Sequence, residues 1–155
     1  MFIDESGFDH QMIKENCWSP RGQKIIGERS GSARGRTSVI GGLCCGKAIG
    51  MFYFNGHTDT EVFCTWLEKV LLPELKEGQV VVLDNASFHP KGRTEEILNK
   101  KGCKTLFMSP YSPDLNPIEQ YWGWCKGRIK SMWQSEKSFY EKLDEVLCMK
   151  YRISI

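Results

Sequence analysis

The most constraining feature of the sequence is an uninterrupted apolar run, Val80–Leu83, that ends directly at Asp84. A strand that is exposed on one face alternates polar and apolar residues, whereas a strand covered on both faces does not. The run therefore predicts a central strand of a sheet that carries helices on both sides. The carboxylate of Asp84 follows at the C-terminal end of that strand, where open α/β sheets bind their ligands.

Three further strand signals precede this run. Two β-rich segments, 37–43 and 48–54, flank a short turn in which Gly46 suits a tight hairpin, so we expect an antiparallel pair. Phe2-Ile3 runs directly into Asp4 and is interpreted as the end of a strand whose beginning is missing. Asp4 is thereby expected at a strand end, where a partial strand holds it poorly.

Helix signals alternate with the later strands. A capping box at Thr58-Asp59-Thr60-Glu61 predicts a helix that begins at Thr58 and that Pro73 and Gly78 bring to an end. The remaining predicted elements are a short helix near 94–100, a strand over 104–108, a loop over 109–115, a helix starting at Asn116 with Pro117 at its first position, and a helix starting at the Ser138 capping box. This order predicts an α/β fold in which a mixed sheet begins as an antiparallel hairpin, continues with parallel strands, and carries helices on both faces.

The composition is that of a single folded domain. The chain has 155 residues, 41% hydrophobic and 12% aromatic, which is enough apolar material for a core. No apolar run approaches the roughly 20 residues that a membrane helix needs, and the early carboxylate Asp4 argues against a signal peptide. Seven scattered cysteines without a Cys-x-x-Cys pair are expected to be reduced thiols. We therefore expect a cytoplasmic protein without membrane contact.

Basic residues are unevenly distributed, although the formal net charge is only +2. Between Arg21 and Lys47 there are six basic residues and one acidic residue, Glu28, in a Gly/Ser-rich segment. Such a segment can follow a phosphate backbone, or it can be a solvated loop. The candidate DNA-binding residues of this segment are Arg21, Lys24, Arg34 and Arg36.

Three carboxylates are candidates for metal chemistry: Asp4, Asp84 and Glu119. The predicted topology places both aspartates at strand ends and Glu119 in the first turn of a helix that returns over the same edge. Carboxylates that converge repel one another unless a cation lies among them, and Mg²⁺ prefers carboxylate, water and phosphate oxygens. Two such ions about 3.5–4 Å apart can activate a water or a 3′ hydroxyl and stabilise the leaving oxygen of a phosphodiester.

Each carboxylate also has a purely structural alternative. Glu119 completes the capping arrangement that begins at Asn116. Asp84 followed by Asn85 suits an Asx-turn at the end of a strand. Asp4 suits a surface acid near a chain terminus.

A phosphate-binding loop is the competing enzymatic hypothesis. Residues 41–48 nearly spell that motif, and Asp84 would then follow the acidic strand of a nucleotidase. Ala48 stands where the motif requires a Ser or Thr that binds Mg²⁺, and the following residues indicate a strand where the motif requires a helix. Both features count against a nucleotidase.

The most specific motif is Ser109–Glu119, eleven residues that read SPYSPDLNPIE and are followed by Trp122 and Lys126. This motif resembles the signature of bacterial insertion-sequence transposases of the mariner superfamily. Residues 81–89 (VVLDNASFH) resemble the second catalytic block of that family, residues 2–7 (FIDESG) its first block, and residues 18–22 its early loop. The 34 residues between Asp84 and Glu119 are a spacing that the superfamily uses. The resemblance covers nearly the whole chain and implies an RNase H-like fold.

The resemblance implies a DDE transposase catalytic domain that cleaves and joins DNA strands. Asp4, Asp84 and Glu119 would be its catalytic triad and would bind Mg²⁺ or Mn²⁺, as a two-metal site. Asn85 and His89 would be accessory residues that orient the scissile phosphate, with a loop histidine of no role as the alternative.

The helix after Glu119 carries further candidates. Three basic residues of this helix are expected either to contact the DNA backbone or to form a solvated face: Lys126, Arg128 and Lys130. Trp122 and Trp124 are expected to pack in the core rather than to stack on bases, since Trp122 shares a helix face with apolar residues.

The implied partners are the DNA of the element ends and of the target, together with a second copy of the chain in a homodimer. Transposases of this kind usually carry an N-terminal helix-turn-helix region that binds the element ends. We therefore expect residues 1–155 to be an N-terminally truncated catalytic domain without that region, associated with the nucleoid. The alternative is a catalytically inactive remnant that binds only DNA or a partner transposase through its basic surface.

Overall fold

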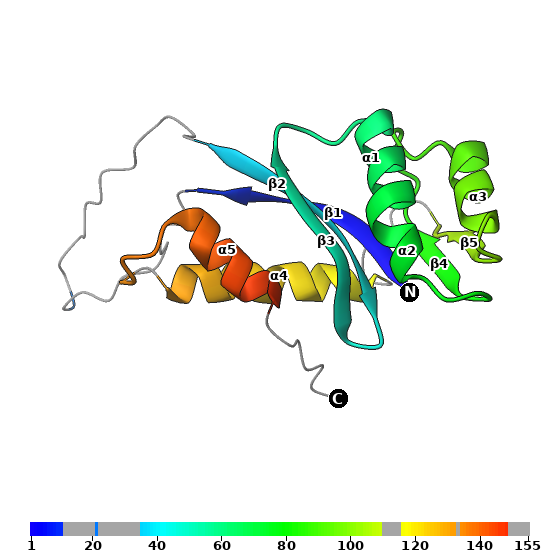
Figure 1. Cartoon of the computed structure of the whole chain (residues 1–155). Coiled ribbons are helices and arrows are strands. Elements are labelled where there is room, and N and C mark those ends of the chain that lie inside the picture. The colour runs from blue at the N-terminus through cyan, green and yellow to red at the C-terminus, as the bar shows by residue number, and fades with distance from the viewer. Residues whose placement is uncertain (11–20, 22–34, 110–115, 133, 149–155) are drawn as a thin grey trace.

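The computed structural model describes residues 1–10, 21, 35–109, 116–132 and 134–148 (Figure 1). These residues form a five-stranded sheet of order β3-β2-β1-β4-β5. The strands are β1 (Phe2–Asp9), β2 (Arg36–Cys44), β3 (Lys47–Asn55), β4 (Val80–Leu83) and β5 (Lys104–Phe107). The first three strands are antiparallel, and β1, β4 and β5 are parallel, which confirms the predicted mixed sheet.

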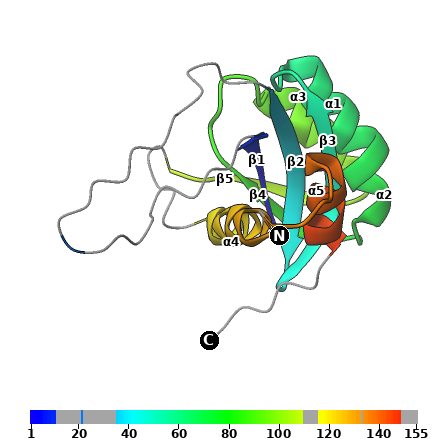
Figure 2. The same cartoon turned by 90° about the vertical axis from the view of Figure 1, so that its left-hand side faces the viewer.

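Helices cover both faces of this sheet, as expected. They are α1 (Thr60–Trp66), the π-helical turn η1 (Leu67–Leu71), α2 (Leu72–Glu74), α3 (Lys91–Asn99), α4 (Pro117–Ser131) and α5 (Phe139–Cys148). Figure 2 shows α1, α2 and α3 on one side of the sheet and α4 on the other. No helix in the described part of the chain is long and apolar enough to cross a membrane.

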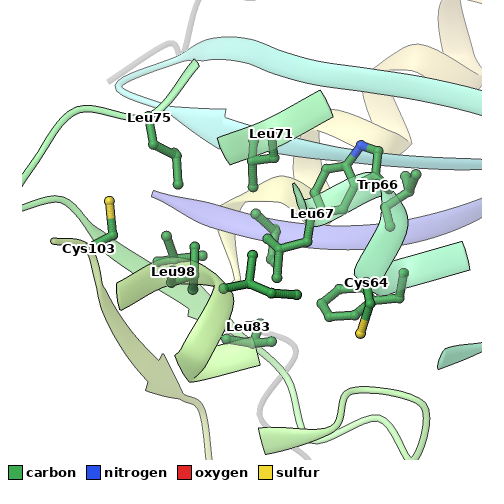
Figure 3. Packing of buried hydrophobic residues seen from close by; sticks show 13 residues of the cluster. Cys64, Trp66, Leu67, Leu71, Leu75, Leu83, Leu98 and Cys103 are labelled. Atoms are coloured by element: carbon green, nitrogen blue, oxygen red, sulfur yellow. The ribbon is translucent and has the colours of Figure 1, made fainter. Parts of the chain in front are cut away.

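Two hydrophobic clusters lie on opposite faces of the sheet. The first packs α1, η1 and α3 against the strands through residues such as Leu67, Leu71, Leu83 and Leu98 (Figure 3). Within it the Trp66 indole Nε1 donates a buried hydrogen bond of 2.7 Å to the Gly50 carbonyl on β3. The second cluster packs α4 and α5 against β1 and β2 through residues that include Phe8, Val39, Trp122, Ile129 and Leu143. The sheet is therefore buried from both sides.

β1 is longer than the sequence indicated. The apolar fragment predicted a strand that ends at Asp4, whereas β1 continues to Asp9 and pairs with β2 along its whole length. On its other side β1 pairs in parallel with β4, where Phe2 is level with Val82. The prediction was wrong because residues 5–7 carry no β-forming pattern, and the hydrogen bonds from β2 hold them extended instead. Asp4 lies inside a central strand, not at a poorly held end.

The β2–β3 hairpin confirms the predicted turn at Gly46. Cys44 pairs with Lys47, so Cys45 and Gly46 form a two-residue loop. Their φ angles are +49° and +75°. A type I′ turn requires positive φ at both central residues. Glycine adopts positive φ freely, whereas a residue with a side chain, such as Cys45, resists it.

Three helix starts test the predicted caps. The first helix is capped by Asp59 and not by Thr58, because the Asp59 carboxylate accepts from the Val62 amide at 2.8 Å. α3 begins at Lys91, three residues before the predicted 94–100 segment, because Pro90 at the N-cap needs no amide partner. The Ser138 capping box forms as predicted: its amide donates to Glu141 Oε2 at 2.7 Å, and its hydroxyl accepts from the Glu141 amide.

The cysteines of the described residues are free thiols, as expected. The phosphate-loop hypothesis is wrong, because residues 41–48 form the β2–β3 hairpin and not a loop that leads into a helix. A nucleotidase site is thereby excluded from this segment.

The hairpin turn yields a stability prediction. Cys45→Asn should raise the free energy of unfolding by about 0.5–1 kcal/mol, because Asn-Gly fits a type I′ turn better than a residue that resists positive φ. Cys45→Ala is the matched control, since it removes the thiol without relieving the backbone, and it should give no gain. Chemical denaturation of the three proteins measures the effect. Equal stability of the Asn and Ala variants would contradict the turn assignment.

Candidate active site

Asp4 and Asp84 occupy equivalent positions on neighbouring strands. The parallel register pairs Phe2 with Val82, and two further residues along each chain bring Asp4 level with Asp84. β4 ends at Leu83, so Asp84 is the first residue beyond that strand. Continued in this way, the register places Asp4 and Asp84 at neighbouring backbone positions where β4 ends, which is where the sequence predicted a ligand site.

Asp4 is buried, with 9% of its surface exposed. Its Oδ2 accepts a hydrogen bond of 3.1 Å from the Trp122 indole Nε1 on α4. Burial, followed by repulsion from Glu5 and from Glu119, raises the pKa of Asp4 to about 7. A carboxylate under these conditions needs either a proton or a nearby cation.

Trp122 has a role that the sequence did not indicate. It packs in the second cluster as predicted, edge-on to Phe8 with ring centroids 6.1 Å apart, but it also holds the Asp4 carboxylate. Gly41 pairs with Asp4 across β1 and β2. A Cβ at Gly41 would lie 2.4 Å from Met51 Sδ but at an ordinary contact distance of 3.5 Å from the Trp122 ring, so the missing side chain makes room for Met51.

Asp84 forms the Asx-turn that was its structural alternative. Its Oδ1 accepts from the Ala86 amide at 2.9 Å and also lies 3.0 Å from His89 Nδ1. The hydrogen bond from His89 lowers the pKa of Asp84 despite partial burial. Within the described residues no hydrogen bond reaches Oδ2. The Asx-turn therefore leaves one oxygen of this carboxylate available to a ligand.

His89 bridges two carboxylates. Besides Asp84 at Nδ1, its Nε2 lies 3.0 Å from Glu5 Oε1. Burial disfavours the charged imidazolium, but the hydrogen bonds to Asp84 and Glu5 outweigh burial and raise the pKa of His89 to about 9. Because both acceptors are carboxylates, both ring nitrogens donate. The sequence suggested His89 as an accessory residue, but Glu5 carried no signal beyond its place in the first motif.

Glu119 lies in the first turn of α4 and is exposed. Asn116 caps this helix by accepting from the Ile118 amide. The Asn116 part of the predicted capping arrangement is confirmed, whereas no hydrogen bond of the Glu119 side chain occurs within the described residues. No group of three or more His, Cys, Asp or Glu side chains in that part of the chain lies close enough to hold a metal ion. The described residues therefore form no three-carboxylate cluster, although the charge of Glu119 is close enough to raise the pKa of buried Asp4.

The other predicted site residues lie around this edge. Asn85 is exposed, and its side-chain amide donates to the Met108 carbonyl just beyond β5, which ties the loop after β4 to that strand. The Lys126 ammonium lies 5.3 Å from the centroid of the Phe8 ring. The exposed basic residues that were predicted to bind DNA are Arg21, Arg36, Arg128 and Lys130. Lys24, Arg34, and the loop over 110–115 lie outside the described residues.

Similar folds occur in solved structures of Mos1 transposase complexes and of an integrase core domain. A Mos1 strand transfer complex matches with a TM-score of 0.66 and 15% identity over 94% of this chain and 49% of that chain. The Mos1 mariner paired end complex with Mn gives 0.63 and 16%, over 94% and 50%. The catalytic core domain of BIV integrase gives 0.54 and 15%, over 78% and 79%. The chain thus has the predicted RNase H-like fold and spans about half the length of the Mos1 chains.

The family follows from the sequence itself. A model of the DDE superfamily endonucleases matches residues 1–140, so the chain belongs to this superfamily. No curated protein matches the chain. Membership implies dependence on a divalent metal ion, and it confirms the DDE part of the resemblance stated above.

The raised pKa of Asp4 yields a prediction for the metal-free protein. The pKa of Asp4 is about 7 in the folded protein, above the reference value of 3.8 for an unfolded chain. The free energy of unfolding therefore falls as the pH rises from 3.8 to about 7, because the folded protein resists the loss of this proton. Asp4→Asn keeps an oxygen for Trp122 and removes the charge. It should therefore raise the free energy of unfolding at pH 8 on the order of 4 kcal/mol, since the shift is about 3 pKa units at about 1.4 kcal/mol each.

Denaturation in the presence of a chelator from pH 4 to pH 9 measures this effect. The gain should grow between pH 4 and pH 7 and stay constant above. Asp9→Asn, on the exposed end of the same strand, is the control and should show no gain. A pH-independent effect of Asp4→Asn would contradict the burial of an unpaired charge.

Proposed function

We propose that the chain is the catalytic domain of an insertion-sequence DNA transposase that cleaves and joins DNA strands. Asp4, Asp84 and Glu119 are its metal-binding catalytic residues in this proposal. The observation that carries it is the β1–β4 register, which sets two carboxylates level at one sheet edge in a chain of the DDE superfamily. The 34-residue spacing from Asp84 to Glu119 supports the third residue.

The donor atoms fit a hard divalent cation. Asp84 Oδ2 has no hydrogen bond within the described residues, and buried Asp4 is destabilised by the neighbouring charges of Glu5 and Glu119. Glu119 is exposed and free of side-chain hydrogen bonds in the same part of the chain, so its carboxylate can move toward the two aspartates. Carboxylate oxygens are the ligands that Mg²⁺ and Mn²⁺ prefer. A pair of such ions would supply charge neutralisation and activation of the attacking oxygen.

The protein's own residues hold the site for DNA. Trp122 fixes Asp4 from the α4 side of the sheet, and His89 fixes Asp84 from the other side. Arg128 and Lys130 project from the α4 helix beyond Glu119, and Arg36 is exposed where β2 begins. Basic side chains at these places suit contacts to the phosphates of element ends and target DNA, which bind more weakly as salt rises. A homodimer that pairs two ends completes the proposal.

A second candidate is a remnant that binds DNA without cutting it. It is supported by the absence of a three-ligand cluster within the described residues. Exposed basic residues on α4 would still bind polyanions. The two candidates differ in one observable, which is metal-dependent cleavage.

Nicking of supercoiled DNA in Mg²⁺ or Mn²⁺ tests the function. The folded wild-type chain should nick DNA only with metal, and Asp84→Asn should lower the rate at least ~100-fold because it removes a charged ligand from the site. Asp9→Asn is the matched control, a carboxylate on β1 away from the site, and should nick like wild type. Circular dichroism confirms that each protein is folded. A folded wild-type chain that binds DNA and never nicks it supports the remnant instead.

A further inference from the structure

We propose that Glu5 is a positioning residue for the metal site, acting through His89 to orient the carboxylate of Asp84. The inference rests on the proposed function, in which Asp84 is a metal ligand. Glu5 would itself contact neither metal nor DNA. Its role would be to hold the histidine that holds the ligand.

The alternation of β1 separates the two adjacent acids. Successive side chains of a strand point to opposite faces, so Asp4 turns toward Trp122 on α4 while Glu5 turns toward the face covered by α1 and α3. There Glu5 is nearly enclosed, with 14% of its side chain exposed. An acidic side chain is placed there at a cost unless it has a specific partner. His89 is that partner.

The three groups form a continuous chain of contacts. Glu5 Oε1 lies 3.0 Å from His89 Nε2, and His89 Nδ1 lies 3.0 Å from Asp84 Oδ1. The Ala86 amide donates to the same Asp84 oxygen at 2.9 Å. Oδ1 is thus saturated by two donors, and Oδ2 is the oxygen left to bind a cation. The arrangement favours binding through a single oxygen of Asp84.

The histidine is also held by packing. Its ring centroid lies 4.2 Å from that of Phe63 on α1 and 4.6 Å from that of Phe88. In this apolar setting the Nε2 group has one hydrogen-bond partner within the described residues, which is Glu5. A buried polar group that loses its partner is destabilised, and a ring fixed at one nitrogen can tilt where a ring fixed at two cannot.

Removing the Glu5 side chain should therefore disturb the orientation of the Asp84 carboxylate through His89, although Asp84 itself is unchanged. Groups that hydrogen-bond to metal ligands fix the ligand's geometry, and their loss commonly weakens metal binding about 10–100-fold. A residue that only braces β1 against the loop after β4 would instead change stability and leave metal affinity unaltered. Metal affinity is the readout that separates the two roles.

The test measures Mn²⁺ binding to the whole chain by calorimetry without DNA, and the Mn²⁺ concentration that gives half-maximal nicking. Glu5→Ala should weaken Mn²⁺ binding about 10–100-fold and raise the half-maximal concentration in parallel, with most of the nicking rate restored at saturating metal. Glu5→Gln retains an oxygen acceptor for Nε2 and should lose less. Asp9→Ala, an exposed acid on the same strand, should bind Mn²⁺ like wild type.

A folded Glu5→Ala protein with wild-type Mn²⁺ affinity overturns the inference. If that variant does not fold, Glu5→Asp replaces it, because the shortened carboxylate keeps its charge but withdraws from Nε2. Unaltered affinity in Glu5→Asp likewise counts against the role. Wild-type Mn²⁺ binding that Asp84→Asn does not weaken also overturns it. If the protein binds Mn²⁺ through Asp84 but never nicks DNA, the proposed function is wrong, and the effect of Glu5→Ala on Mn²⁺ affinity still tests the role of Glu5.

Discussion

The parallel pairing of β1 with β4 is the constraint on which the site depends. Residues 2–9 and 80–83 are far apart in sequence, and only the sheet's register sets Asp4 beside Asp84. β1 is central, paired with β2 along its length and with β4 where it begins, so its position is fixed from both sides. A one-residue slip would turn Asp4 to the opposite face and bring Glu5 to the α4 side. The register is thus as important as the identity of the acids.

The two aspartates are held from opposite faces of the sheet and in different electrostatic states. Trp122 reaches Asp4 from α4, within a buried setting whose like charges raise the pKa of Asp4. His89 reaches Asp84 from the α1 side, and its hydrogen bond lowers the pKa of Asp84. Neighbouring carboxylates whose environments push their pKa values apart are typical of catalytic sites. Under the proposed function, the buried charge of Asp4 lowers the stability of the metal-free protein and prepares a site for a cation.

Prediction from the sequence was reliable where local chemistry decides the structure. The turn at Gly46 and the capping box at Ser138 formed as predicted, because each rests on contacts within a few residues. The strand at Val80–Leu83 also formed as predicted, because an unbroken apolar run is a local pattern that reflects burial on both faces. It was wrong where distant residues decide. β1 extends past Asp4 because β2 pairs with it. The start of α3 at Lys91 is a different case, since the adjacent Pro90 is a local signal that the prediction missed.

The sequence by itself determined the order of strands and helices, the DDE family and the choice of Asp4 and Asp84 as candidate acids, since these follow from periodicity and from motifs. Only the tertiary structure decided how those acids are held. Trp122 contacts Asp4 across 118 positions of the chain. His89, which holds Asp84, contacts Glu5 across 84 positions. No local pattern encodes such contacts, because they exist only once the sheet's register and the packing of α1 and α4 have brought the side chains together.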